Sequence, residues 1–158
     1  MAHSIDLRAL LAARFQGRPV TIIPHHTTQS LRLPFFETRI PAGFPSPAED
    51  YLDRGLDLNE LVVKHPAATF FVRVEGESMI GAGIHPGDTL VVDRAEQAAH
   101  GRIVVAVIDG DFTVKRIRKI DGKLLLASEN PDLPPLHIAP EAGFEVWGVV
   151  TYVIHRIR

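Results

Sequence analysis

The chain contains no cysteine among its 158 residues, which excludes disulfides, thiol nucleophiles and cysteine-ligated zinc sites. It also lacks an excess of positive charge, because 17 lysines and arginines face 19 acidic residues and the formal net charge is -2. Such a balance does not favour nucleic acid as a direct partner. No apolar run approaches the length of a membrane-spanning helix, and the N-terminus lacks the pattern of a signal peptide. We therefore expect a soluble cytoplasmic protein with one compact domain and a tail.

Eight histidines raise the question of a metal site. Only His25 and His26 are close in sequence, and adjacent histidines cannot share one helix face. No carboxylate stands at ligand spacing from them. The sequence therefore predicts histidines in loops and on the surface, with no metal and no cofactor.

The N-terminal third predicts little packed structure. Residues 4–16 have the apolar spacing of one short amphipathic helix, and the proline-rich stretch 19–47 predicts an extended arm that does not pack. A capping box at residues 46–49 predicts a short helix that runs to about Arg54. Residues 57–60 repeat this pattern and predict a second short helix that ends before Pro66.

From Thr69 onward the sequence is typical of β structure. Six segments are rich in β-branched and aromatic residues, at 69–74, 89–92, 103–108, 112–117, 123–127 and 146–155. The dipeptides at 109–110 and 121–122 are both Asp-Gly, a strong signal for a hairpin turn. The sequence predicts a mainly β fold of antiparallel sheets with short helices. The last strand is apolar on both faces, which indicates a place in a sheet centre or against a second subunit.

Ser78 and Lys115 are the clearest candidates for catalytic residues. Ser78 follows Gly76 in a short turn after an apolar strand, where backbone N–H groups can point at a developing oxyanion. A lysine can activate a serine if it is held neutral. In water the pKa of a lysine is about 10.4, and burial can lower it by about three pH units. A serine after glycine can equally be a plain turn residue, and a strand lysine an exposed edge residue.

An ordered series of motifs resembles the LexA-type self-cleaving serine peptidases over residues 43–153. The series comprises Gly76-Glu77-Ser78-Met79, Gly83-Ile84-His85-Pro86-Gly87-Asp88, Val104-Val105-Ala106-Val107 and Phe112-Thr113-Val114-Lys115-Arg116. Within that family the chain is most similar to the UmuD-type SOS mutagenesis proteins. That similarity rests on residues 43–48, 57–59, 65–66 and 146–150.

The resemblance implies a role for each site residue. Ser78 is expected to be the nucleophile and Lys115 the general base, 37 residues further on. The backbone N–H groups of Glu77 and Ser78 are expected to form the oxyanion hole. The family cuts its own arm between a small residue and a glycine, which here is the Ala42–Gly43 bond.

That cut would divide the chain into an arm at 1–42 and a LexA-like peptidase domain at 43–158. Pro41 departs from expectation, because a proline before the cleaved residue has no N–H to donate when this segment docks as a strand. The helix expected at 4–16 is a second departure, since the arm is longer than is usual in this branch.

The resemblance also implies partners. A filament of RecA on single-stranded DNA would stimulate the cut, and the shortened homodimer would serve a UmuC-type Y-family translesion DNA polymerase. Sequence-specific DNA binding and membrane attachment are not expected. Two alternatives remain open: a LexA-like transcriptional repressor and a non-catalytic polymerase accessory dimer. The repressor would need several helices in its N-terminal region, whereas residues 1–42 offer one.

Overall fold

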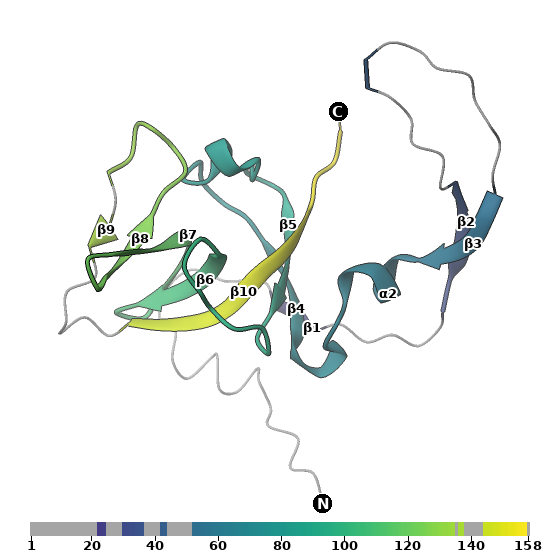
Figure 1. The fold of residues 1–158 in the computed structure, drawn as a ribbon, viewed down its shortest axis with the longest axis horizontal. Helices are drawn as coiled ribbons and strands as arrows, with labels where there is room; N and C mark the ends of the chain where they lie inside the picture. The colour runs from purple at the N-terminus through teal and green to yellow at the C-terminus, as the bar shows by residue number, and fades with distance from the viewer. Residues whose placement is uncertain are drawn as a thin grey trace, which may run out of the picture.

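The computed structural model describes residues 22–24, 30–36, 42–43, 52–134, 136–137 and 144–157. These residues form one eight-stranded antiparallel sheet and a separate two-stranded hairpin, with only short helices (Figure 1). The predicted mainly β fold is therefore confirmed. The helix expected at residues 4–16 lies outside the described residues.

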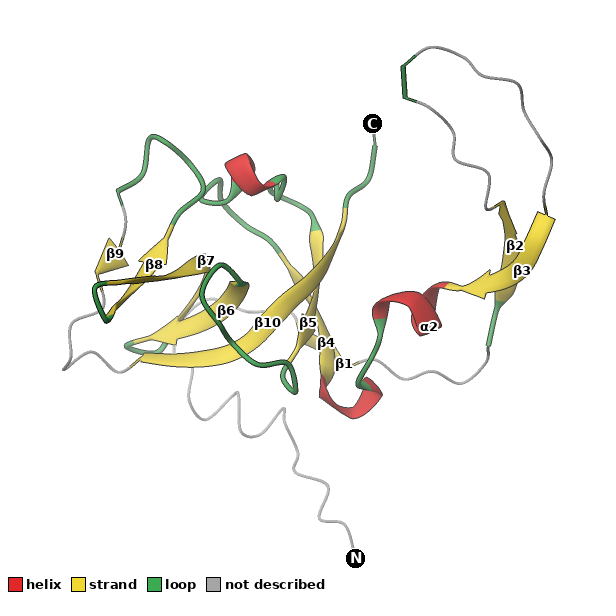
Figure 2. Cartoon of the chain, in the orientation of Figure 1, coloured by secondary structure: helices red, strands yellow, loops and turns green. Residues whose placement is uncertain are grey.

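The large sheet has the strand order β1-β4-β5-β10-β6-β7-β8-β9. The strands of this sheet are β1 (Ile22–Pro24), β4 (Thr69–Arg73), β5 (Thr89–Asp93), β6 (Ile103–Ile108), β7 (Asp111–Ile120), β8 (Lys123–Ala127), β9 (Leu136–His137) and β10 (Phe144–Ile154). The small hairpin joins β2 (Arg32–Phe36) to β3 (Leu52–Asp57). The helical segments are α2 (Leu58–Val62), η1 (Pro66–Ala68) and η2 (Ile80–Ala82), which Figure 2 draws in red.

Strand β10 holds the sheet together, because it pairs with β5 on one side and β6 on the other. It runs diagonally across the whole sheet (Figure 1). Its register shifts against β6 between Val146 and Gly148 and against β5 between Val150 and Tyr152, and such bulges bend a strand. The sequence expectation of a sheet-centre strand is correct for this strand up to Val150, beyond which its end is exposed.

Alternate residues of the central strands contribute to apolar clusters, of which the two largest lie on opposite faces of the sheet. Core 1 gathers Phe70, Val72, Val74, Met79, Ile84, Leu90, Val92, Val105 and Trp147. Core 2 gathers Val104, Ala106, Ile117, Leu126 and Val149. Both faces of β6 are therefore covered, which explains why its sequence is continuously apolar.

Both predicted Asp-Gly hairpins are present. Asp109 and Gly110 join β6 to β7 with φ of 49° and 93°, and Asp121 and Gly122 join β7 to β8 with φ of 48° and 76°. Two consecutive positive φ values are what a two-residue hairpin turn requires. These turns fix the register of β7, which places Lys115 opposite Val104.

Three sequence expectations need correction or extension. The helix expected to reach Arg54 is wrong at its end, because residues 52–57 form β3; pairing with β2 overrides the local capping signal, whose own residues 46–49 are not described. The arm was expected not to pack, yet β1 joins the edge of the large sheet beside β4. Its Pro24 is tolerated there because an edge strand leaves one side unpaired. The short strand β9 was not anticipated.

The second short helix is confirmed as α2. Its N-cap is Asp57, whose side chain accepts a hydrogen bond from the N–H of Asn59 at 2.8 Å. Among the described residues, no helix is long and apolar enough to cross a membrane.

Candidate active site

Ser78 lies in a closed loop that leaves the sheet after β4 and returns at β5. The base of the loop is a pair of backbone hydrogen bonds, in which Val74 N–H donates to Asp88 O at 2.9 Å and Gly87 N–H donates to Val74 O at 3.0 Å. Gly76 turns the chain with a φ of +83°, a conformation that other residues rarely adopt. The predicted glycine-assisted turn before the serine is therefore present.

The residue after the serine anchors this loop to core 1. Met79 is buried, and its carbonyl oxygen accepts hydrogen bonds from the N–H groups of Ala82 at 3.0 Å and Ile84 at 3.2 Å. Ile84 is also fully buried. Ser78 is itself half-buried at the margin of the core, so its hydroxyl is positioned by a packed neighbour on its C-terminal side.

Lys115 lies in the middle of β7, and its amine and the hydroxyl of Ser78 donate hydrogen bonds to the same carbonyl oxygen. Its Nζ donates to the carbonyl oxygen of Val114 at 3.2 Å. Ser78 Oγ donates to the same oxygen at 3.5 Å. The hydroxyl and the amine, from residues far apart in the sequence, therefore converge on one point of β7.

The half-buried position of Lys115 changes its protonation. Burial lowers the pKa of Lys115 from its ordinary value of 10.5, because desolvation disfavours the charged ammonium. No carboxylate among the described residues forms an ion pair with this amine. Desolvation therefore makes the neutral amine, which could accept a proton, more accessible than it is for a lysine in water.

The backbone around Ser78 offers two unused donors. In the described part of the chain, the N–H groups of Glu77 and Ser78 donate no hydrogen bond. The carbonyl oxygens of both residues are occupied, by Asn130 Nδ2 at 3.0 Å and by Glu129 N–H at 2.9 Å. Because the Glu77 carbonyl shares its peptide plane with the Ser78 N–H, the bond from Asn130 orients that donor while leaving it available to an incoming oxygen.

The segment after β8 holds the serine loop in place, a role that was not predicted from the sequence. Glu129 uses its backbone twice, since its N–H donates to Ser78 O at 2.9 Å and its carbonyl oxygen accepts from Gly81 N–H at 2.6 Å. Asn130 is buried and adds its side-chain bond to Glu77 O. A polar Ser-Glu-Asn run directly after a strand is the signal that could have pointed to this clamp.

Charged side chains of β7 hold the clamp in turn. The carboxylate of Glu129 accepts from Arg116 Nε at 2.5 Å and from an Arg118 guanidinium nitrogen at 3.3 Å. The hydrogen bond from Arg116 is the main cause that lowers the pKa of Glu129 below 4.5. Arg116 also donates to Gly101 O at 2.6 Å. Glu129 is therefore charged and fixed at neutral pH.

The expected cleavage site lies apart from this constellation. Ala42 and Gly43 are exposed, and no heavy atom stands within 4 Å of where a Gly43 Cβ would be. They lie between β2 and β3, at the opposite side of Figure 2 from η2, the short red helix that follows Ser78. The structure brings Ser78, Lys115 and the Glu77 backbone together, and it does not bring the Ala42–Gly43 bond to them.

Comparisons with known proteins identify the relatives of this chain. The Peptidase S24-like family model matches residues 34–151. Protein ImpA of Salmonella typhimurium is 51% identical over 131 residues, covering 79% of this chain and 85% of ImpA. Protein SamA of the same species is 46% identical over 137 residues, covering 87% of this chain and 95% of SamA. Both are UmuD-like SOS mutagenesis proteins.

A more distant relative is the LexA repressor of Paracidovorax citrulli. It is 35% identical over 118 residues, which cover 75% of this chain but only 52% of the repressor. The resemblance inferred from the motif series is confirmed by these matches. The chain belongs to the Peptidase S24-like family, whose members are generally serine peptidases.

Proposed function

We propose that this chain is a self-cleaving serine peptidase of the SOS response, with Ser78 as nucleophile and Lys115 as general base. The observation that carries the proposal is the convergence of Ser78 Oγ and Lys115 Nζ on the carbonyl oxygen of Val114. The lowered pKa of Lys115 supports it, because only a neutral amine can take the serine proton.

The reaction follows from these positions. Neutral Lys115 takes the proton of the Ser78 hydroxyl as Oγ bonds to the carbonyl carbon of Ala42. The tetrahedral oxyanion is stabilised by the free N–H groups of Glu77 and Ser78. Lys115 then gives the proton to the Gly43 nitrogen, the peptide bond breaks, and an ester joins Ala42 to the serine. Water, deprotonated by the same amine, hydrolyses this ester.

The Ala42–Gly43 bond must travel to reach the serine. Both residues are exposed in the segment between β2 and β3, apart from η2. Movement of the segment between β2 and β3 within one chain, or exchange of that segment between two chains, would bring the bond to Ser78. Because the substrate is tethered, its effective concentration is high once it docks. The cut separates an arm, residues 1–42, from a peptidase domain, residues 43–158.

The family also suggests how cleavage is regulated and what the cleaved product does. We propose that a RecA filament on single-stranded DNA stabilises the docked conformation, which raises the cleavage rate by shifting a population that already exists. The product would act in the cytoplasm as a homodimer that assists a UmuC-type translesion polymerase. The exposed apolar side chains at the end of β10 and just after it support a dimer interface, since Tyr152, Ile154 and Ile157 are 41%, 44% and 82% exposed.

The test follows self-cleavage of the purified chain by intact mass. One experiment uses activated RecA filaments at neutral pH, and the other uses about pH 10 without RecA, where a lysine base is neutral. We expect a single cut after Ala42 under both conditions. Ser78→Ala and Lys115→Ala should each abolish it while the fold, checked by circular dichroism, is retained.

The matched control is a lysine of the same strand outside the site. Lys119→Ala should cut at the wild-type rate, because its side chain does not reach the shared Val114 oxygen. Normal cutting by Ser78→Ala would overturn the proposal. A cut at any bond other than Ala42–Gly43 would be compatible with the Ser78–Lys115 dyad but would show that the assigned cleavage site is wrong.

A further inference from the structure

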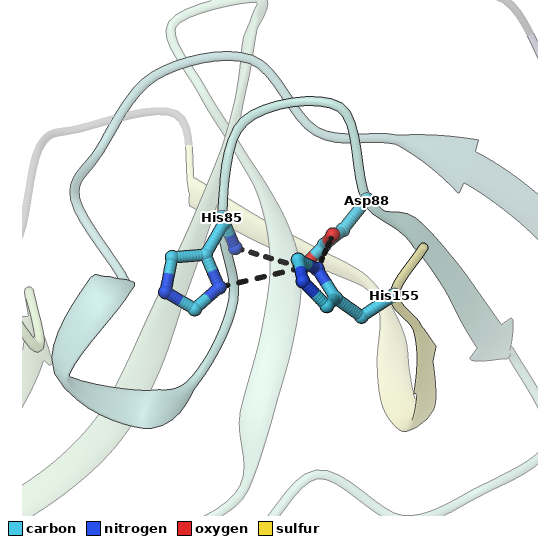
Figure 3. Close-up of side chains that lie close together, drawn as sticks. All are labelled: His85, Asp88 and His155. Atoms are coloured by element: carbon cyan, nitrogen blue, oxygen red, sulfur yellow. Dashed lines mark hydrogen bonds and ion pairs between the residues drawn. The ribbon is translucent and has the colours of Figure 1, made fainter. Parts of the chain in front are cut away.

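Two histidines and one aspartate lie together at the base of the loop that carries Ser78 (Figure 3). His155 Nδ1 is 2.6 Å from Asp88 Oδ1, and His85 Nδ1 is 3.8 Å from Asp88 Oδ2. The two imidazole rings stack at a tilt, with centroids 5.3 Å apart. One ligand atom from each residue lies within 4.8 Å of the other two. This is a compact set of two nitrogens and one carboxylate.

The three residues come from two different parts of the fold. His85 and Asp88 belong to the turn between η2 and β5, while His155 directly follows β10. Sequence spacing could not reveal this group, because His155 is 67 residues away from Asp88. The expectation that the histidines are isolated in loops and on the surface therefore misses a cluster that only the antiparallel pairing of β5 with β10 creates.

Asp88 is a buried carboxylate that is held in place by a backbone hydrogen bond. Its side chain is only 3% exposed, and its Oδ2 accepts the backbone N–H of His85 at 2.8 Å. A carboxylate has about four lone-pair sites, so the present hydrogen bonds leave room for a further partner. The rings of His85 and His155 are 49% and 46% exposed, which opens the cluster to solvent on their side.

A second histidine–carboxylate group shows what disfavours a cation. His65, Asp93 and Glu96 also lie close together, but Glu96 is already paired with Lys64 at 2.8 Å and lies 3.9 Å from Arg102. Those side chains neutralise it and would repel an incoming ion. No lysine or arginine of the described chain forms an ion pair with Asp88.

We propose that His85, Asp88 and His155 form a binding site for a divalent transition-metal ion of the Zn²⁺ type. Two imidazoles with one carboxylate are a ligand set that Zn²⁺ accepts, with water completing the coordination. Tetrahedral ligands at about 2.0–2.1 Å from zinc are about 3.3 Å apart. The separations of 2.6 Å and 3.8 Å, which run to the two different oxygens of Asp88, lie on either side of this value, so side-chain rotations that bring both imidazoles to one carboxylate oxygen would form the site.

Metal binding requires one proton rearrangement. His155 Nδ1 lies 2.6 Å from Asp88 Oδ1, a hydrogen-bond distance that the tautomer with its proton on Nδ1 satisfies. In the tautomer with its proton on Nε2 the Nδ1 lone pair is available, and the ion takes the place of that hydrogen between the two side chains. No redox step is involved, because Zn²⁺ keeps its oxidation state.

The site would connect the serine loop to the end of the central strand. Asp88 O accepts from Val74 N–H at the base of that loop, and Val74 leads into the Gly76 turn. A metal bridge to His155 would therefore stiffen the frame in which Ser78 is held. It would also fix the last residues after β10, whose side chains are otherwise largely exposed.

The test measures Zn²⁺ binding by calorimetry on the full chain in its Ser78→Ala form, which stays intact during titration. We expect the double variant His85→Gln and His155→Gln to bind one Zn²⁺ fewer per chain than the parent. Each single variant should weaken binding at this site by at least about 100-fold, since even supporting residues around a metal are worth 10- to 100-fold. Zn²⁺ should raise the Tm of the parent but not of the double variant through this site.

His65→Gln provides the matched control, because it removes the histidine of the other cluster. It should bind like the parent. Co²⁺ should give the visible absorption of a low-coordinate nitrogen and oxygen site in the parent and in His65→Gln only. Unchanged stoichiometry in the double variant would overturn the proposal. So would a loss of the ion in His65→Gln, which would place it at the other cluster.

Discussion

Gly81→Ala is the most direct probe of the clamp around Ser78. A Cβ at this position would stand 2.5 Å from the carbonyl oxygen of Glu129 and 3.2 Å from its carbonyl carbon. That oxygen already accepts the N–H of Gly81 at 2.6 Å. Both obstructing atoms belong to the backbone, so no flexible side chain can move aside. The two segments must separate by about 0.9 Å to bring this contact from 2.5 Å to the ordinary minimum of 3.4 Å.

The size of the effect follows from two opposing contributions. Overpacking of this kind typically costs about 1–3 kcal/mol, whereas alanine in place of glycine gains about 0.4–1 kcal/mol by restricting the unfolded chain. We expect a net loss of about 1–2 kcal/mol in the free energy of unfolding. The effect on cleavage should be larger, because Glu129 N–H holds the carbonyl of Ser78 itself. Misplacement by about 1 Å can cost a hundredfold in rate, so we expect cleavage to slow about 10- to 100-fold.

The assay combines urea unfolding with the intact-mass cleavage assay at about pH 10. Gly148→Ala is the matched control, because its Cβ would stand 2.6 Å from Val92 Cγ1 in the sheet centre, away from the clamp. It should lose stability without a specific loss of cleavage. A folded Gly81→Ala protein that cleaves at the wild-type rate would refute the idea that Glu129 positions Ser78. Equal slowing in both variants would show that the effect is only global.

Three further outcomes are expected. Burial lowers the pKa of Lys115 from 10.5, so RecA-independent cleavage should rise about tenfold per pH unit and level off before pH 10.5; a rate still climbing above that pH would contradict a lysine base. The pKa of Glu129 is held below 4.5 by Arg116, so its ion pair stabilises the fold above that pH and is lost as the pH falls through the lowered value. The Tm of the wild type should therefore fall more steeply below about pH 4.5 than the Tm of Glu129→Gln, and parallel curves would contradict this. Ile154→Glu should turn the dimer into a monomer in sedimentation, while Leu124→Glu, 37% exposed on β8, should not; a dimer that survives Ile154→Glu has its interface elsewhere.

Sequence reasoning worked where structure is set by neighbours along the chain. The two Asp-Gly turns and the strands beside them follow from local preferences, and β6 and β8 have the predicted bounds. It failed where distant pairing decides. The capping box before β3 predicts a helix, but β2 supplies a pairing partner that no local pattern reveals. The same limit applies to His155, whose cluster with Asp88 depends on the register of β10 against β5.

The reactive side chains of the candidate site could be predicted from the sequence, but the backbone contacts that position them could not. A serine after a glycine turn and a lysine on a strand can be recognised as residue types, and the motif series ties them to one family. The contact that joins them passes through the carbonyl oxygen of Val114, which any residue type could supply. The clamp likewise uses the backbone of Glu129. Backbone groups carry no sequence signature, so their roles emerge only from the fold.

Strand β7 concentrates these functions in three consecutive residues. The carbonyl of Val114 receives the serine and the lysine, Lys115 provides the amine, and Arg116 binds the carboxylate of the clamp. Because neighbouring residues of a strand point to opposite faces, a slip of one residue would send all of these groups to the wrong side at once. The register is fixed by the turn at Asp109 and Gly110, where both φ values are positive. A tight turn with no part in the proposed chemistry thus determines whether the proposed base, the proposed nucleophile and the clamp meet.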